Sequence, residues 1–144
     1  SKYLVLQNPD WGEPWNPITS LRNLVSVTPI TNTGAAFGLL PDQGTLFAIA
    51  ALIVVVGILA YERHIPQNQP LLRISLGMQL GGAAGNLFDR LHLGQVIDFI
   101  DFKFCPIFNL ADSAIVIGVA ILVFYLWRNP EREVAEDSGR SGAE

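Results

Sequence analysis

The residues best suited to chemistry are two aspartates that each stand beside apolar residues. Asp98 lies within Val-Ile-Asp-Phe, and Asp112 follows Phe-Asn-Leu-Ala a short distance further on. Burying an ionised side chain at membrane depth costs about 2.5 to 3.5 kcal/mol on insertion scales, so such an acid is a functional candidate by default. Asp112 taken alone is better explained as a helix N-cap, and Asp98 or Asp101 can be explained as a solvated loop acid. Asp101 fits that plainer explanation better than Asp98 does.

Two carboxylates together can hydrolyse a peptide bond. One must be ionised to take a proton from water, while its neighbour stays protonated to polarise the carbonyl. Carboxylates a few ångströms apart cannot both hold charge at low cost, so the pair shares a proton. A helix that begins at Asp112 favours the charged form of that acid, which leaves Asp98 as the more frequent holder of the proton. The pair predicts an aspartic hydrolase.

Two further polar clusters would meet the acids if the apolar segments pack as a bundle. In residues 32–38, Asn32 precedes small residues that allow close backbone approach, although a simple turn that leads into a helix explains this segment better when it is taken alone. Asn86, Asp89 and Arg90 are spaced i, i+3 and i+4, so they project from one side of a helix end.

Glycines precede that helix end at a regular spacing. Gly77, Gly81 and Gly85 recur every fourth residue and predict a smooth ridge for tight helix packing. Packing combined with an interfacial charge pair is the plain structural explanation of the whole cluster.

Three apolar segments position these clusters. Residues 45–61 and 113–127 run without a charge over lengths close to the roughly 20 residues that cross a bilayer. Residues 74–88 are glycine-rich and reach that length only if Asn86 lies near an interface. Each segment is internal and lacks the charged start and cleavage site of a secretion signal. The sequence predicts an α-helical multi-pass membrane protein, a helix bundle with three spans.

The first 44 residues predict an extramembrane, β-rich segment. Five prolines break any long helical period. Residues 24–31 favour a strand and residues 31–34 a turn, which together predict a small sheet on the membrane surface. Trp11 and Trp15 then anchor the sheet at the lipid headgroups or line a substrate entrance.

The remaining organisation follows from charge. Residues 45–128 form the bundle, with an outer catalytic loop at 89–111, and the polar residues 129–144 form a disordered cytoplasmic tail. By the positive-inside rule, basic residues near the other helix ends favour a cytoplasmic location for those ends; they are Arg63, Arg73, Arg128 and Arg132. The bias is weak, because the opposite side also carries basic residues, namely Lys2, Arg22, Arg90 and Lys103. The formal net charge of -4 gives no reason to expect nucleic acid as a partner. Cys105 and the two histidines lack metal-ligand spacing.

Four segments in series, TNTGAAFG, GGAAGNLFDR, VIDF and FNLADSA, resemble the motif set of the lipoprotein signal peptidases, also called signal peptidase II. The resemblance covers residues 1 to about 127. It implies a membrane aspartic endopeptidase that removes the signal peptide from diacylglyceryl-modified prolipoproteins and cuts just before the lipidated cysteine. It also implies no metal or other cofactor, a monomer, membrane lipid as a further partner, and an active site at the outer face of the bacterial inner membrane.

By motif, Asp98 and Asp112 match the catalytic pair of the family. The residues that match those lining the family's site are Asn32, Gly82, Asn86, Arg90 and Asn109, together with Lys2, which matches a lysine at the outer end of the first family helix. The family fold has four membrane helices. Its first helix carries an aspartate four residues before the position of Lys2, so that helix would precede this sequence and three spans fall within it.

Two other classes of membrane protein were considered against the residues, and the transporter class remains as the alternative. Presenilin-like proteases would carry a glycine-x-glycine-aspartate motif, which this sequence lacks. A small proton or cation transporter subunit would use Asp89, Asp98 and Asp112 as a relay. The transporter predicts acids spread through the depth of the membrane, whereas the predicted spans gather them at one end.

Overall fold

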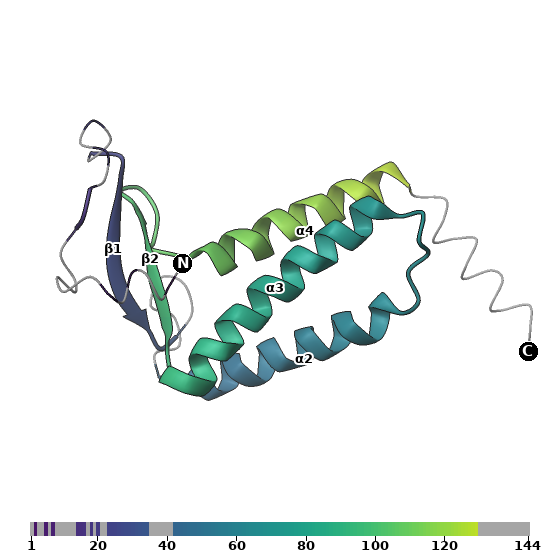
Figure 1. The fold of residues 1–144 in the computed structure, drawn as a ribbon, viewed down its shortest axis with the longest axis horizontal. Coiled ribbons are helices and arrows are strands. Elements are labelled where there is room, and N and C mark those ends of the chain that lie inside the picture. The colour runs from purple at the N-terminus through teal and green to yellow at the C-terminus, as the bar shows by residue number, and fades with distance from the viewer. Residues whose placement is uncertain are drawn as a thin grey trace, which may run out of the picture.

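The computed structural model describes residues 2, 5, 7, 14–16, 18, 20, 23–34 and 42–129. Its main elements are β1 (Val25–Asn32), α2 (Gly44–Glu62), α3 (Pro70–Leu93), β2 (Val96–Phe102) and α4 (Leu110–Arg128). The helices lie side by side with α3 between α2 and α4, and the two strands lie across one end of them (Figure 1). Trp11, residues 35–41 and all but the first residue of the predicted tail lie outside the described residues.

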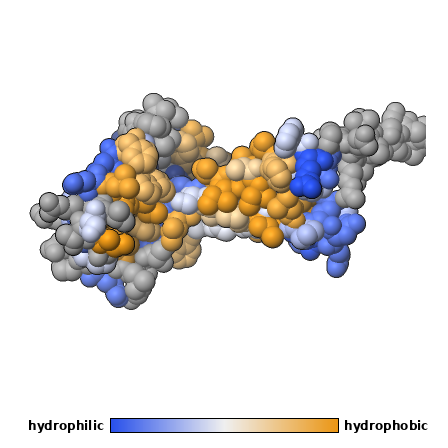
Figure 2. Space-filling model, turned by 90° about the horizontal axis from the view of Figure 1, so that it is seen from above, coloured by the Kyte–Doolittle hydropathy of each residue, from blue (hydrophilic) through white to orange (hydrophobic). Residues whose placement is uncertain are grey.

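Helix α2 is apolar on every side and has no buried residue. Its exposed side chains include Ile53 and Val56, and α4 likewise exposes Val116 and Val123. On the face that Figure 2 shows, apolar residues form a belt across the middle of the helices, with hydrophilic residues at both ends. Among the described helices, α2 and α4 are long and apolar enough to cross a membrane. Both were predicted as spans.

Helix α3 is not among those two, so the third predicted span is not confirmed. Its 24 residues nevertheless reach about 36 Å at 1.5 Å per residue. Pro70 begins the helix where a missing N–H does no harm, and Gly94 ends it with a φ of 73°, a left-handed conformation that suits glycine. Its polar residues Ser75 and Asn86 are buried, because α3 has a neighbouring helix on both sides.

Helices α3 and α4 approach closely at two glycines. A Cβ added to Gly82 would overlap the Ala111 carbonyl oxygen and lie 2.6 Å from Ile115 Cγ1. A Cβ on Gly118 of α4 would lie 2.8 Å from the Ser75 carbonyl oxygen. The predicted glycine ridge is therefore wrong for the most part: Gly77 and Gly81 have nothing within 4 Å of such a Cβ, and Gly85 makes only an ordinary contact.

The sheet pairs β1 with β2 in antiparallel register, with Val27 opposite Ile100 and Ile30 opposite Asp98. The register shift between these two pairs leaves Thr28 and Pro29 opposite the single residue 99, which is a β-bulge. A proline cannot donate to the ladder, and a bulge is one of the few places in a sheet that accept it. The bulge places Asn32 on the same face as Asp98.

The strand predicted at residues 24–31 is present as β1, but it extends through Asn32, so the predicted turn at 31–34 begins later, at Thr33. The partner strand β2 was not predicted. It comes from the segment expected to be an outer loop, whose first residues instead complete α3.

Candidate active site

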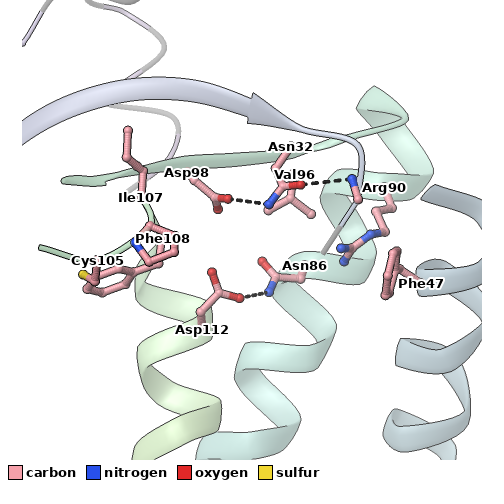
Figure 3. Close-up of a pocket in the computed structure, with 12 residues that line it drawn as sticks. Asn32, Phe47, Asn86, Arg90, Val96, Asp98, Cys105, Ile107, Phe108 and Asp112 are labelled. Atoms are coloured by element: carbon pink, nitrogen blue, oxygen red, sulfur yellow. Dashed lines mark hydrogen bonds between the residues drawn. The ribbon is translucent and has the colours of Figure 1, made fainter. Parts of the chain in front are cut away.

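The two aspartates line one pocket of about 420 Å³, to which four elements contribute polar side chains (Figure 3). Asp98 comes from β2, Asp112 from the first turn of α4, Asn86 from α3 and Asn32 from the end of β1. The side chains of both acids point into the space between the sheet and the helix ends. The lining residues are Asn32, Gly34, Phe47, Asn86, Arg90, Val96, Asp98, Cys105, Pro106, Ile107, Phe108 and Asp112.

Asn109 caps helix α4. Its Oδ1 accepts hydrogen bonds from the backbone N–H groups of Ala111 (2.7 Å) and Asp112 (3.2 Å). In return, Oδ2 of Asp112 accepts the Asn109 N–H at 3.1 Å, which completes a capping box. The explanation of Asp112 as the N-cap is therefore wrong, because Asp112 is the third helical residue and Asn109 is the cap.

Two asparagine side chains connect the two acids. Asn109 Nδ2 donates to Asp98 Oδ1 at 2.6 Å and to Asn86 Oδ1 at 3.2 Å. Asn86 Nδ2 in turn donates to Asp112 Oδ1 at 2.7 Å. Since the Asn109 oxygen is held by backbone N–H groups, its Nδ2 must face Asp98 and Asn86. The relative placement of Asp98 and Asp112 is thus fixed by hydrogen bonds.

Asp98 is 2% exposed and accepts a second amide hydrogen bond, from Asn32 Nδ2 at 3.0 Å. Asn32 Oδ1 accepts the Gly34 N–H at 3.0 Å, so this amide also has one orientation. Burial raises the pKa of the Asp98 carboxyl, and the hydrogen bonds from Asn32 and Asn109 oppose that effect only in part. The nearby charge of Asp112 raises the pKa further. The environment thus favours a proton on Asp98.

Lys2 reaches the site from the N-terminal part of the chain. Its Nζ donates to Asn86 Oδ1 at 2.9 Å and to Asp89 Oδ2 at 2.6 Å. Asp89 Oδ2 also accepts the Ile97 N–H at 3.3 Å. Asp89 was not among the predicted site residues. Its spacing from Asn86 placed it on the right side of the helix, but no sequence signal pointed to its partners.

Arg90 lies over the ring of Phe47, with its Cζ 5.4 Å from the ring centroid. This is the geometry of a cation–π contact between α3 and the start of α2. Its Nε is buried and has no hydrogen-bond partner within the described part of the chain. The guanidinium lines the same pocket as the acids and can bind an acceptor there.

The hairpin after β2 supplies the apolar wall of the pocket, with Cys105, Pro106, Ile107 and Phe108. Phe108 exchanges backbone hydrogen bonds with Ile100 at 2.8 and 3.1 Å, which folds the hairpin against the strand. This wall was not predicted. Its residues are ordinary apolar side chains, and their place depends on a strand that the sequence did not indicate.

Gly82 does not line the pocket, although it was predicted to do so. It lets α4 approach α3 beside Ala111, the residue before Asp112.

Asp101 is not a solvated loop acid. It lies in β2 and accepts hydrogen bonds from Ser26 and Thr28, each at 3.1 Å, and from Lys103 at 2.5 Å. Within the residues that the structure describes, no group of three or more acidic, histidine or cysteine side chains could hold a metal ion.

Similarity to known proteins points to one family. The family model described as signal peptidase (SPase) II matches residues 1–128. The lipoprotein signal peptidase of Moorella thermoacetica is 44% identical over 126 residues, which cover 88% of this chain and 82% of the relative. That of Desulfitobacterium hafniense is 46% identical over 108 residues, covering 74% and 72%.

The fold is similar to that of solved proteins as well. Two structures, each described as a bacterial membrane enzyme, superpose with TM-scores of 0.78 and 0.74 at 28% and 29% identity. They cover 90% and 89% of this chain, and this chain covers 79% and 83% of them. Matches of this extent and identity show that the chain belongs to the signal peptidase II family.

Proposed function

We propose that this protein is an aspartic endopeptidase that removes signal peptides from diacylglyceryl-modified prolipoproteins and cuts before the lipidated cysteine. Membership of the signal peptidase II family makes it a bacterial membrane protein and a hydrolase. The aspartic mechanism is supported by one observation above all: Asp98 and Asp112 share a pocket and are joined through Asn109 and Asn86.

In this mechanism Asp98 holds the proton and Asp112 is ionised. The raised pKa of buried Asp98 supports the first assignment. The donors that surround Asp112, namely Asn86 Nδ2 and the N-terminal turn of α4, suit a charged carboxylate. Asp112 then takes a proton from the attacking water while Asp98 polarises the scissile carbonyl.

The rest of the pocket suits a lipidated peptide. Arg90 and Asn32 offer donors to the peptide backbone, and Phe47 with the hairpin at 105–108 offers apolar contact. The apolar outer faces of α2 and α4 leave room for acyl chains beside the pocket. Binding the remote lipid would hold the scissile bond in place against the acids.

The same geometry supports a proposal for the location of the pocket. The pocket is lined by residues of both strands and of the helix ends next to the sheet. The loop that joins α2 to α3 lies at the opposite end of the helices (Figure 1). We place the pocket at the outer face of the inner membrane, with α3 as the third span and the protein acting as a monomer without a metal. The transporter alternative gains no support, because the family is one of peptidases.

The test is to replace each acid by its amide in the full-length protein. Asp98→Asn and Asp112→Asn should each lower the rate of cleavage of a lipidated precursor by at least about 10³-fold, because neither amide can exchange the proton. Glu62→Gln is the matched control. It makes the same chemical change at an exposed acid at the other end of α2 and should cleave normally. Normal cleavage by either active-site variant would exclude the proposed pair.

A further inference from the structure

We infer that Asp89 is a positioning residue that holds both proposed catalytic acids in place, an inference that rests on the proposed function. Asp89 contacts neither acid directly. It acts along two routes, one through the backbone of β2 and one through Lys2 and Asn86.

The first route leads to Asp98. Oδ2 of Asp89 accepts the N–H of Ile97, the residue directly before Asp98, at 3.3 Å. This bond ties the start of β2 to the last turns of α3. A shift of Ile97 would carry Asp98 with it, away from the amides of Asn32 and Asn109.

The second route leads to Asp112. Lys2 Nζ is held by Asp89 at 2.6 Å and donates to Asn86 Oδ1 at 2.9 Å. With its oxygen occupied by Lys2 and Asn109, Asn86 must present its Nδ2 to Asp112. Without the ion pair, the Asn86 amide loses one of the two donors that fix its orientation.

The burial of the pair makes the contact strong. Asp89 is 7% exposed, and the Lys2 side chain is 17% exposed. Hydrogen bonds between ionised groups are stronger where water is excluded, and a buried charge without a partner is unfavourable. A simpler role would be to fasten residue 2 to α3 with no effect on chemistry, so the test must separate the two roles.

Charge provides that separation. The charged groups around Asp98 are Asp112 of α4, whose charge raises the pKa of Asp98, and Lys2, whose charge lowers it. On α3, Asp89 pairs with Lys2, and Arg90 lines the same pocket as Asp98. The alkaline limb of the pH–rate profile marks the loss of the proton from Asp98 in the proposed mechanism. Asp89→Asn removes the negative charge that offsets Lys2. The pKa of Asp98 should therefore fall, and the alkaline limb should move to lower pH. Lys2→Met removes a positive charge and should move the same limb to higher pH. A loss of structural order in the site alone would not shift the alkaline limb in opposite directions in the Asp89→Asn and Lys2→Met variants.

The experiment measures kcat, KM and their pH dependence for cleavage of a lipidated precursor by the purified full-length protein. We expect each single variant to lower kcat by at least about tenfold with little change in KM, because the displaced groups are the acids rather than the substrate contacts. The limb should move by about half a pH unit or more in each case. The double variant should lower kcat no further than Asp89→Asn alone does, because Lys2 acts through its ion pair with Asp89.

Asp101→Asn is the matched control. Asp101 also pairs with a lysine, Lys103 at 2.5 Å, and also lies on β2, but it is hydrogen-bonded to Ser26 and Thr28 away from the pocket. It should lower thermal stability and leave kcat and the pH limb unchanged. Should Asp89→Asn fail to fold, Lys2→Met breaks the same ion pair and decides the question.

Two failures are distinguishable. An inactive wild-type protein, or a fully active Asp98→Asn variant, would contradict the proposed function itself. A wild-type protein that depends on Asp98, together with Asp89→Asn or Lys2→Met variants whose kcat and pH limb match those of Asp101→Asn, would overturn the positioning role alone.

Discussion

Asn109 uses all of its side-chain hydrogen-bonding capacity in one place. Its oxygen caps α4 through two backbone N–H groups, and its nitrogen donates to Asp98 and Asn86. The side chain is 0% exposed, so each of these groups would be unsatisfied if its partner were lost. The cap of a helix and the alignment of the proposed acids therefore depend on the same residue.

Asn109→Asp separates these two roles. Aspartate caps a helix about as well as asparagine, so α4 should keep its stability. The Nδ2 donor is lost, and a further negative charge faces Asp98. Both changes raise the pKa of Asp98, so the alkaline limb of the pH–rate profile should move to higher pH while kcat/KM falls by about 10- to 100-fold. A limb that moves to lower pH would contradict the proposed protonation of Asp98, and Asn129→Asp at the far end of α4 serves as the control.

The sequence indicated most of these residues but not their connections. Asp98, Asp112 and the asparagines followed from motifs, because each is a polar residue in an apolar context. Asp89 was not predicted as a site residue, because its partner Lys2 lies 87 residues away along the chain. Contacts over such a distance are set by the packing of whole elements, and local spacing carries no record of them.

At the scale of elements, the placement of Asp112 depends on how closely α4 approaches α3. Gly82 permits that approach beside Ala111, whose carbonyl oxygen a side chain would overlap. The glycine periodicity predicted the wrong positions for the close contact with α4. A repeat of four residues shows which glycines share a side of the helix, but it does not show which side packs against the neighbouring helix. The same limit applies to β2, whose sequence has apolar residues on both faces and so lacks the alternation that marks a strand.

Gly82→Ala should force the two helices apart. Overpacking of this kind costs typically about 1 to 3 kcal/mol, and the shift would also displace Asp112, so both melting temperature and cleavage rate should fall. Gly81→Ala is the neighbouring control on the same helix. Its Cβ would meet nothing within 4 Å, and replacing glycine within a helix contributes about 0.5 to 1 kcal/mol of stability. Equal effects of the two substitutions would mean that the contact at Gly82 does not limit the approach.

Over the whole molecule, polarity divides along the helix axis. The apolar belt covers the middle of the helices, and the pocket lies beyond it, against the sheet (Figures 2 and 3). Composition identified α2 and α4 as spans because both are strongly apolar, and both expose many of their apolar side chains. Composition could not settle whether α3 spans the membrane. The polar residues of α3 lower its mean hydropathy, although they are buried between two neighbouring helices.

Cysteine labelling in intact cells tests whether α3 crosses the membrane. In a Cys105→Ser background, Phe104→Cys introduces a thiol at a side chain that is 77% exposed in the hairpin after β2. Gln67→Cys places one in the exposed loop between α2 and α3. An impermeant thiol reagent should label the first in intact cells and the second only after the membrane is opened. Labelling of both from one side would mean that α3 does not span the bilayer.

The extra residue at Thr28 and Pro29 interrupts the alternation of the strand that ends at Asn32. Successive side chains of a regular strand point to opposite faces, yet Val27 and Ile30 share one face because two residues oppose a single one between them. Deletion of either bulge residue would leave a regular ladder in which Ile30 still lies opposite Asp98, so Asn32 would keep its face. Deletion of Thr31 would instead turn Asn32 away and bring Thr33 to the face of Asp98. This strand therefore tolerates a change in length at the bulge but not between the bulge and the proposed site.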